Sequence, residues 1–550
     1  MDTMTPKGYI SFIFHAHLPY VRHPEHQQSL EEKWYFEALT ECYIPMLRVF
    51  HEMADENIDY AVTFSLSPTL LAMLEDPFMQ ERYTAYLAGL QHLARKEEKR
   101  TAGDSRFAPL TQMYRERLDY AAYLFNEKYD RKLVNAFKDL QDRGKLELIT
   151  AAGTHGYLPL LAVQREAAYA QLVTGIDNYR RIFGKTPRGI WLPECAYDPV
   201  LEEMLGELGL QYFITATHGV LYASPRPKYG VYSPILTPGG LAAFGRDPET
   251  SHQVWSAKEG YPGDYAYREF YRDIGYDLEL DYIGEHLHPA NLRGNTGFKY
   301  YRITGEGNHK EVYDRQHALH KAREHAANFK FNREKQVEYY GGVMDRPPLL
   351  VAPYDAELFG HWWFEGPQWV DSLCRMLHGQ NHIQMITPGQ YLDQGYALQL
   401  STPNISSWGD KGYHEVWLNN KNDWLYRHLH HAAERMTELA TAHPQAEGVQ
   451  KEALTQLARE LLLAQSSDWP FIMTAGTMDR YALSRVSKHL ERFLMLEQQI
   501  RENNIDIPWL RAISASDNLF PHLDYRIYQS MESTVPVEKN YEEAVLAGSR

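Results

Sequence analysis

Short apolar runs that each end in polar residues recur along this chain, and this pattern most constrains its fold. Amphipathic stretches of helical length, such as residues 165–183 and 199–208, separate the runs. Such alternation is typical of parallel strands joined by crossover helices. We therefore expect an α/β protein whose predicted strands are residues 9–14, 60–64, 146–150, 189–192, 211–215, 349–352 and 383–386.

The polar residues that follow these runs favour a barrel. In (β/α) barrels the functional side chains lie at the carboxyl ends of the strands and on the loops that follow. His15, Glu194 and Asp355 occupy such positions. An open doubly wound sheet has the same local pattern, but no G-x-G-x-x-G turn follows an early run, which argues against a dinucleotide-binding sheet.

Two regions depart from the alternation. Residues 76–130 are long, charged and helical in pattern, and the region from residue 401 onward shows helical periodicity at residues 425–441, 450–463 and 480–502. We predict a catalytic barrel formed by residues 1–75 and 131–400, a helical insertion at 76–130, a helical C-terminal domain at 401–535 and a tail at 536–550.

The charge of the chain excludes some partners. There are 56 Lys and Arg against 72 Asp and Glu, a net charge of −16, and without a basic run this argues against nucleic acid or an anionic membrane. The N-terminus has no signal-peptide pattern, and three widely spaced cysteines suggest neither a disulfide framework nor a cysteine zinc site. We expect a soluble cytoplasmic protein, and the 13% aromatic residues suit a carbohydrate site.

Two carboxylates are the strongest candidates for chemistry. Glu194 stands in W-L-P-E-C-A-Y and Asp355 in A-P-Y-D-A-E-L-F-G-H-W-W, each directly after a predicted strand. Glycosidic bond cleavage needs two carboxyl groups, one acting as a nucleophile and the other held protonated. A structural alternative for Glu194 is a helix N-terminus, and an alternative for Asp355 and Glu357 is a metal site with His361.

Histidines and tryptophans near these motifs allow two interpretations each. His15 and His17 could be a metal pair, although such histidines, like His155, more often bind hydroxyl groups or close a polar network. Trp408 and Trp417 lie in a glycine-bearing loop at the predicted domain junction. Their indoles could stack on pyranose rings or pack the domain interface.

Taken together, these motifs resemble glycoside hydrolase family 57, and within it the 1,4-α-glucan branching enzymes. H-A-H-L-P-Y at the start, G-T-H-G around His155 and S-S-D-W-P-F around Asp468 match the family in the same order as the two carboxylate motifs. The resemblance covers about residues 8 to 530. The long helical C-terminal region is similar to that of the branching enzymes rather than to hydrolases that share only the barrel.

The resemblance implies a (β/α)₇ barrel and a retaining double displacement without a metal or cofactor. Glu194 matches the nucleophile and Asp355 the general acid/base, and we expect their carboxyl groups to lie about 5 to 6 Å apart. The family's mobile loop corresponds to residues 219–240, where Tyr222, Tyr229 and Tyr232 are all candidates. The remaining glucan-binding residues implied by the match are His17, His155, Arg246, Trp255, Gly263, Trp408, Trp417 and Asp468.

The expected partners are α-1,4-glucan donor and acceptor chains, such as amylose and glycogen, and the expected assembly is a monomer or a weak homo-oligomer. Branching requires the 6-hydroxyl of a glucan, rather than water, to attack the covalent intermediate. A 4-α-glucanotransferase or an α-amylase of the same family would use the same two carboxylates. A non-catalytic glycogen-binding protein is disfavoured, since both carboxylates are intact.

Overall fold

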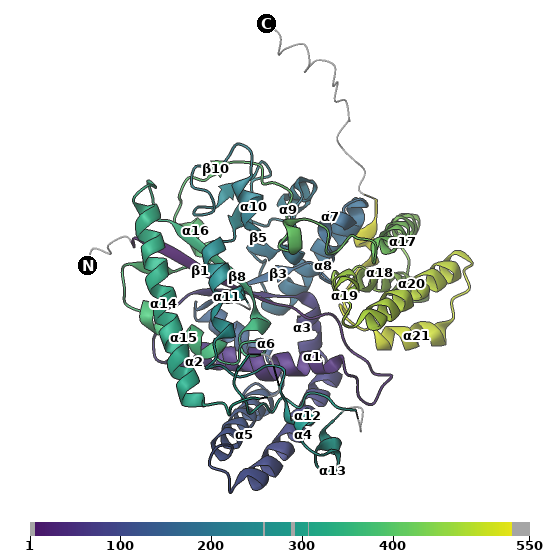
Figure 1. Cartoon of the computed structure of the whole chain (residues 1–550). Helices are drawn as coiled ribbons and strands as arrows, with labels where there is room; N and C mark the ends of the chain where they lie inside the picture. Colours follow the sequence, from purple (N-terminus) through teal and green to yellow (C-terminus); the bar gives the residue numbers. More distant parts are fainter. Residues whose placement is uncertain (1–5, 257–258, 288–291, 306, 308, 531–550) are drawn as a thin grey trace.

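A seven-stranded parallel barrel forms the centre of the molecule (Figure 1). This computed structural model describes residues 6–256, 259–287, 292–305, 307 and 309–530. The barrel strands pair in the order β7-β5-β4-β3-β2-β1-β8, all in parallel. Their bounds are β1 Gly8–Ala16, β2 Val62–Leu66, β3 Leu146–Ala151, β4 Gly189–Trp191, β5 Tyr212–Thr215, β7 Ala242–Gly245 and β8 Leu349–Asp355.

The two ends of this strand series meet. The Asp247 N–H, just after β7, donates to the Val351 carbonyl of β8 at 2.8 Å. The predicted barrel is therefore confirmed, but one predicted member was wrong. The run at residues 383–386 is β9 (Ile383–Met385), which pairs only with the start of β1, and the seventh barrel strand is instead β7, whose Ala-Ala-Phe-Gly sequence carries little strand propensity.

Alternation along β1 explains how the site is built. Ile10, Phe12 and Phe14 pack outward into the main core beneath the surrounding helices, whereas Tyr9 and Ile13 belong to the barrel interior. Because side chains in a strand alternate between faces, His15 follows Tyr9 and Ile13 on the inner side. The fold therefore delivers this histidine to the carboxyl end of the barrel interior.

Helices surround the barrel on its outside. Most follow the predicted crossover pattern, and the predicted helix at residues 165–183 is α8. Two very short strands flank the barrel, β6 (Ile235–Leu236), antiparallel to β7, and β10 (Gln399–Leu400), parallel to β6. The main barrel helices are α1 Glu32–Glu37, α2 Ile44–Asp55, α3 Pro68–Glu75, α6 Val134–Asp142, α8 Arg165–Phe183, α9 Glu202–Glu207, α10 Thr217–Leu221, α11 Pro248–Trp255, α14 Arg315–Gly341, α15 Gly366–Leu377 and α16 Pro388–Asp393.

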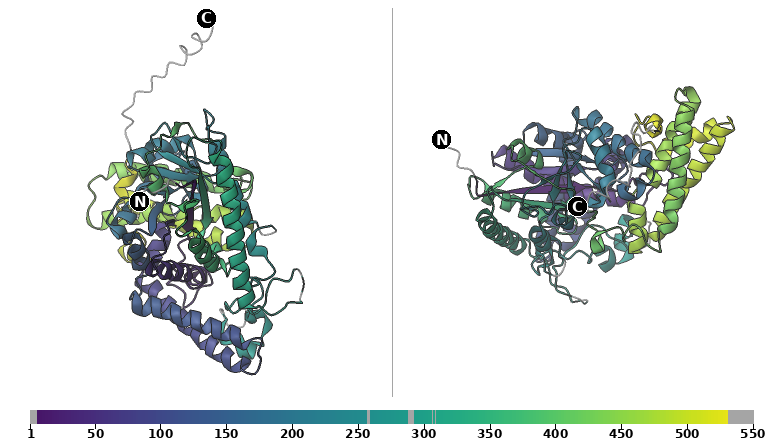
Figure 2. Two further views of the ribbon diagram at one scale, coloured as in Figure 1. Left: turned by 90° about the vertical axis from the view of Figure 1, so that its left-hand side faces the viewer. Right: turned by 90° about the horizontal axis from the view of Figure 1, so that it is seen from above.

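Two helical regions extend from the barrel (Figures 1 and 2). After β2, α4 (Pro77–Thr101) and α5 (Ala108–Ala122) form a hairpin within the predicted insertion, and the Glu97 carboxylate of α4 accepts hydrogen bonds from Tyr282 and Tyr300 of the β7–β8 connection. The C-terminal helices are α17 Asp423–Ala442, α18 Gly448–Ala464, α19 Asp468–Ala475, α20 Asp479–Arg501 and α21 Ile507–Ser516.

The predicted helical C-terminal domain is confirmed, while its limits and those of the insertion stay predictions. The tail predicted at 536–550 lies outside the described residues. Within the described part of the chain, no helix combines the length and the apolar character needed to cross a membrane.

Candidate active site

Both candidate carboxylates lie at the carboxyl ends of barrel strands. Asp355 is the last residue of β8 and pairs with His15 of β1. Glu194 lies in the turn Pro193–Cys195 after β4, where Glu194 has φ +62° and Cys195 has φ +50°. Left-handed backbone at non-glycine residues costs about 1–3 kcal/mol each and is common at functional sites. The turn thus holds Glu194 in a strained backbone conformation.

Two segments from beyond the barrel hold the Glu194 carboxylate. The Trp408 indole N–H donates to Oε2 at 2.8 Å, and the Ser467 hydroxyl donates to Oε1 at 2.9 Å. Burial raises the pKa of Glu194, while these two donors oppose that rise by stabilising the ionised form. The helical C-terminal region, which provides Ser467, thus takes part in the site.

A line of neutral histidines stands behind Ser467. His155 Nδ1 lies 2.9 Å from the Ser467 hydroxyl, His155 Nε2 lies 3.0 Å from His15 Nε2, and His15 Nδ1 lies 3.1 Å from the Ser65 hydroxyl. Burial lowers the pKa of both histidines well below the usual range, and the neighbouring His17 adds to this effect.

The positions of the protons in this line follow from its two ends. Ionised Glu194 can only accept, so the Ser467 O–H points to it and the Ser467 oxygen accepts from His155 Nδ1–H. Neutral His155 then accepts at Nε2 from His15, and His15 accepts at Nδ1 from Ser65. We infer these tautomers from the network; with both nitrogens of His15 engaged, a metal-ligand role for His15 is disfavoured.

His17 belongs to a second, charged group. Its Nε2 lies 3.1 Å from Asp468, its backbone N–H donates to Glu357 at 3.3 Å, and its ring stacks on His155 with centroids 3.8 Å apart. Burial, the largest single cause, would lower the pKa of His17, but the carboxylates of Asp468, Glu194 and Glu357 together outweigh it and the net pKa is raised. Tyr43 also donates its hydroxyl to Glu357.

The pKa of Asp355 is raised more strongly than that of Glu194. Burial is the main cause that raises its pKa well above the usual range, and the carboxylates of Glu357 and Glu194 add to it, while Arg246 acts in the opposite direction. Such surroundings favour the protonated form of the carboxyl group. The two groups thus differ in the way that an acid and a nucleophile must differ.

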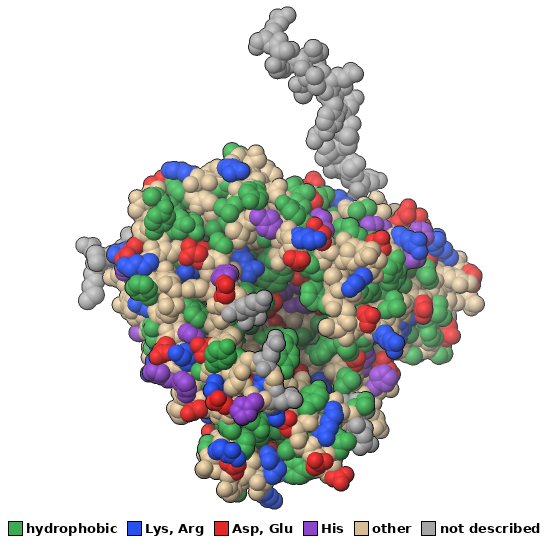
Figure 3. Space-filling view, viewed as in Figure 1, with side chains coloured by type: hydrophobic (Ala, Val, Ile, Leu, Met, Phe, Trp, Pro, Cys, Tyr) green, Lys and Arg blue, Asp and Glu red, His purple; other side chains and the backbone are tan. Residues whose placement is uncertain are grey.

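Trp408 links several of the other predicted residues. Its ring lies edge-on to Trp191 at 5.0 Å and to Trp255 at 6.3 Å, and the Arg246 guanidinium lies 5.8 Å from its centroid. Trp255 is 37% exposed. Trp408, Trp255 and Arg246 therefore form one wall near Glu194. The space-filling view shows a hollow at the centre of this molecular face (Figure 3).

Trp417 does not share this wall. Its side chain is only 1% exposed and stacks on Tyr157 with centroids 4.6 Å apart. A Cβ on Gly409 would come within 2.6 Å of its ring. The geometry thus opposes the interpretation of Trp417 as a sugar-stacking residue, because a pyranose needs an open indole face. For Gly263, which ends the turn Tyr261–Gly263, the described contacts give no link to either carboxylate.

We expect Trp417→Ala to destabilise the protein by about 3–5 kcal/mol, as is usual when a buried indole is removed. Activity per folded molecule should change little. Trp408→Ala should instead lower activity per folded molecule more than it lowers stability. Denaturant unfolding together with activity corrected for the folded fraction distinguishes the two, and a stable Trp417→Ala variant with weakened glucan binding would contradict this assignment.

The three loop tyrosines lie in different places. The Tyr232 carbonyl accepts from Leu349 N–H, at the start of β8, at 2.9 Å, and Tyr229 packs on Arg346, so both lie toward the amino end of the barrel. Tyr222 follows α10, which begins just after the carboxyl end of β5, and is 57% exposed. Of the three, Tyr222 has the position that suits the mouth.

Comparison with known proteins agrees with this geometry. A family model described as "Glycosyl hydrolase family 57" matches residues 11–405, and one described as "1,4-alpha-glucan branching enzyme, C-terminal" matches residues 428–528. The chain belongs to glycosyl hydrolase family 57. Its C-terminal helices are therefore those of a domain known from branching enzymes.

Similar proteins match nearly the whole chain. The solved α-amylase AmyC from Thermotoga maritima is 41% identical with a TM-score of 0.90, over 95% of this chain and 99% of that one. The GH57-type branching enzyme from Pyrococcus horikoshii is 32% identical with a TM-score of 0.86, over 96% and 98%. The 1,4-alpha-glucan branching enzyme TK1436 of Thermococcus kodakarensis is 31% identical over 94% of this chain and 77% of its own length.

Some residues of the site were not predicted from the sequence. Ser467, Tyr43 and Ser65 were not predicted as site residues, and Glu357 was considered only as a metal ligand. Ser467 stood in a motif that had already been noted, directly before Asp468, so its neighbour was a signal. Tyr43 had no such signal, because only the packing of Ala38–Tyr43 against the β8 loop brings its hydroxyl to Glu357.

Proposed function

We propose that this chain is a 1,4-α-glucan branching enzyme that acts by retaining double displacement, with Glu194 as nucleophile and Asp355 as general acid/base. The observation that carries the proposal is the participation of the branching-enzyme C-terminal region in a family 57 site, through the Ser467 hydrogen bond to Glu194 at 2.9 Å. Amylose and glycogen would be donor and acceptor.

The first step would transfer a glucan chain to the enzyme. Asp355, whose burial favours the protonated form, gives its proton to the departing 4-oxygen while Glu194 attacks the anomeric carbon, so the C–O bond breaks as the ester bond forms. Trp408 and Ser467 hold both oxygens of Glu194 and fix their direction of attack.

The second step would form the branch. Asp355, now ionised, takes the proton from a glucan 6-hydroxyl, whose oxygen attacks the anomeric carbon and releases Glu194. Two inversions retain the α configuration. His17, held by Asp468, and Arg246 place positive charge near the reacting sugar. We further propose a cytoplasmic location, where glucan stores are built, and a monomer or weak homo-oligomer.

The decisive product is an α-1,6 linkage. Proton NMR of amylose after incubation with the enzyme should show growing α-1,6 signals while reducing ends stay almost constant. The second candidate is an α-amylase, favoured by the 41% identity to AmyC. That activity would release reducing ends without α-1,6 signals, and such a product pattern would refute the branching proposal.

We expect Ser467→Ala to lower kcat/KM on amylose by roughly 10- to 100-fold, because a hydrogen bond to a charged group contributes about 1.5–3 kcal/mol. Within the described part of the chain, no other donor takes its place directly, since His155 Nδ1 is 3.8 Å from Glu194 Oε1. Loss of this donor also raises the pKa of Glu194, so the acidic limb of the pH profile should move to higher pH.

Ser401→Ala is the matched control, because Ser401 is equally buried but its hydroxyl donates to Pro225 O. An unchanged acidic limb in Ser467→Ala would show that Ser467 does not support the nucleophile.

A further inference from the structure

Trp362 is exposed on the loop that follows the candidate acid Asp355, although its neighbour Trp363 is buried. Trp362 is 52% exposed and Trp363 1% exposed. Both lie on the loop between Asp355 and α15, and the Trp362 N–H donates to the Glu357 carbonyl at 3.4 Å. Leaving half of an indole in water forgoes apolar burial, and exposed apolar residues that gather in one patch mark binding sites.

Phe270 supports one face of the Trp362 indole. Phe270 stacks on it with centroids 4.2 Å apart and planes 26° apart, and the Lys299 ammonium lies 4.1 Å from the centre of the Phe270 ring. The adjacent His361 is fixed by Glu41 at 2.9 Å. Tyr271, edge-on to Phe270 and 77% exposed, extends the surface. A pyranose stacks its C–H face on such a preorganised aromatic surface.

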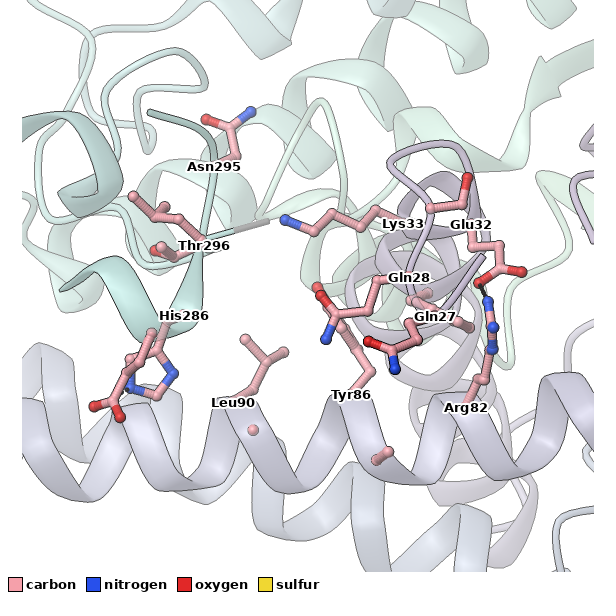
Figure 4. A pocket seen from close by; sticks show the side chains of 16 residues that line it. Gln27, Gln28, Glu32, Lys33, Arg82, Tyr86, Leu90, His286, Asn295 and Thr296 are labelled. Carbon is pink, nitrogen blue, oxygen red and sulfur yellow. Dashed lines mark hydrogen bonds and ion pairs between the residues drawn. The ribbon is translucent and has the colours of Figure 1, made fainter. Parts of the chain in front are cut away.

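A cavity of about 270 Å³ lies between α1 and α4 (Figure 4). Two segments that border this cavity continue along the chain into residues that support the aromatic surface. Thr296 borders the cavity, and Lys299, three residues later, contacts Phe270. On the other side, α1 borders the cavity and continues directly into the turn Ala38–Tyr43, whose Glu41 holds His361.

The lining of the cavity suits a neutral polyhydroxylated ligand. Its acidic residues already have partners, Glu32 with Arg82 and Glu285 with Lys96. The Lys33 side chain extends across the opening (Figure 4). Amide, hydroxyl and ammonium groups match sugar hydroxyls, and the apolar side chains match the sugar C–H face; the residues used here are Gln28, Lys33, Tyr86, Leu90, Asn295 and Thr296.

We propose that Trp362, backed by Phe270, and this cavity form an accessory strip that binds an α-glucan chain away from the bond being cleaved. The inference rests on the proposed function for its ligand class. The strip would hold long chains and leave short substrates unaffected, because a short substrate occupies only the sugar sites beside Glu194 and Asp355.

Affinity electrophoresis of the full chain in amylose-containing native gels tests the strip without catalysis. Trp362→Ala should weaken amylose binding by roughly three- to tenfold, the range for loss of one aromatic contact, and Trp362→Phe should restore part of it. Phe331→Ala, which removes a 55% exposed aromatic on α14, is the matched control and should bind as wild type does.

Gly89→Phe tests the cavity. A Cβ on Gly89 has no neighbour within 4 Å, and replacing a helical glycine favours the helix, so the ring can fill the cavity of a folded protein. This variant should also weaken amylose binding. Unchanged binding would remove the cavity from the strip, and unchanged binding in Trp362→Ala would overturn the proposal as a whole.

Turnover of α-maltosyl fluoride separates this inference from the proposed function. Trp362→Ala and Gly89→Phe should keep wild-type kcat/KM on this short donor while the amylose concentration for half-maximal rate rises. An equal loss on both substrates would assign Trp362 to the catalytic centre and contradict the strip. Wild-type protein that turns over neither substrate would instead refute the proposed function, whatever the gels show.

Discussion

Glu194→Gln is expected to lower activity on every α-glucan by several orders of magnitude. The amide keeps the shape of the side chain but cannot form the ester intermediate, so double displacement stops at its first step. Trp408 and Ser467 currently donate to the two carboxylate oxygens, and the amide nitrogen can only donate back to them. Initial rates on amylose and on α-maltosyl fluoride measure the effect.

Chemical rescue provides the control for Glu194. In Glu194→Ala, azide can enter the vacated space and attack the anomeric carbon once, which gives a β-glycosyl azide from an activated donor. In Asp355→Ala, azide should instead attack the glycosyl-enzyme, so its product should be the α-glycosyl azide. The β product is expected only in Glu194→Ala. Substantial activity of Glu194→Gln without azide would remove Glu194 from the mechanism.

Asp355→Ala should show a loss that depends on the leaving group. Amylose needs protonation of its departing oxygen, and without the acid its cleavage should fall by roughly 10²- to 10⁴-fold. Fluoride leaves with little help, so α-maltosyl fluoride should still transfer its sugar to the enzyme. The second step lacks its base, and the glycosyl-enzyme should therefore accumulate as a burst.

Comparing the two substrates is the measurement, since a folding defect would reduce both rates equally. Glu357→Gln is the informative companion, because Glu357 lies beside Asp355 but is bound by Tyr43 and the His17 backbone. A fluoride burst in Glu357→Gln and none in Asp355→Ala would exchange the roles of these two carboxylates.

The barrel could be predicted because apolar runs that end in polar residues alternate with stretches of helical pattern. The prediction failed for one strand, whose composition does not mark it as a strand. β7 is only Ala242–Gly245, with two alanines and a glycine, and its strand conformation depends on pairing with β5 rather than on local propensity. Ile383–Met385 has a better strand composition but pairs only with the start of β1.

Site residues could be predicted where a single sequence motif contains the reactive group and its flanking residues. Glu194 and Asp355 are of that kind. Trp408 and Trp417 stand in one loop and the sequence offered no choice between them; packing against Tyr157 buries one, and the bond to Glu194 places the other. Ser467 acts only because the C-terminal helices dock against the turn after β4, which is a tertiary contact.

The most direct measurement of the central claim is mass spectrometry of Asp355→Ala after brief reaction with α-maltosyl fluoride. Digestion should yield the peptide that contains Glu194 with one added maltosyl group on that carboxylate, and the double variant that also carries Glu194→Gln should yield none. A maltosyl group on Glu357 or on Asp468, or an unmodified protein that still releases fluoride, would contradict the account.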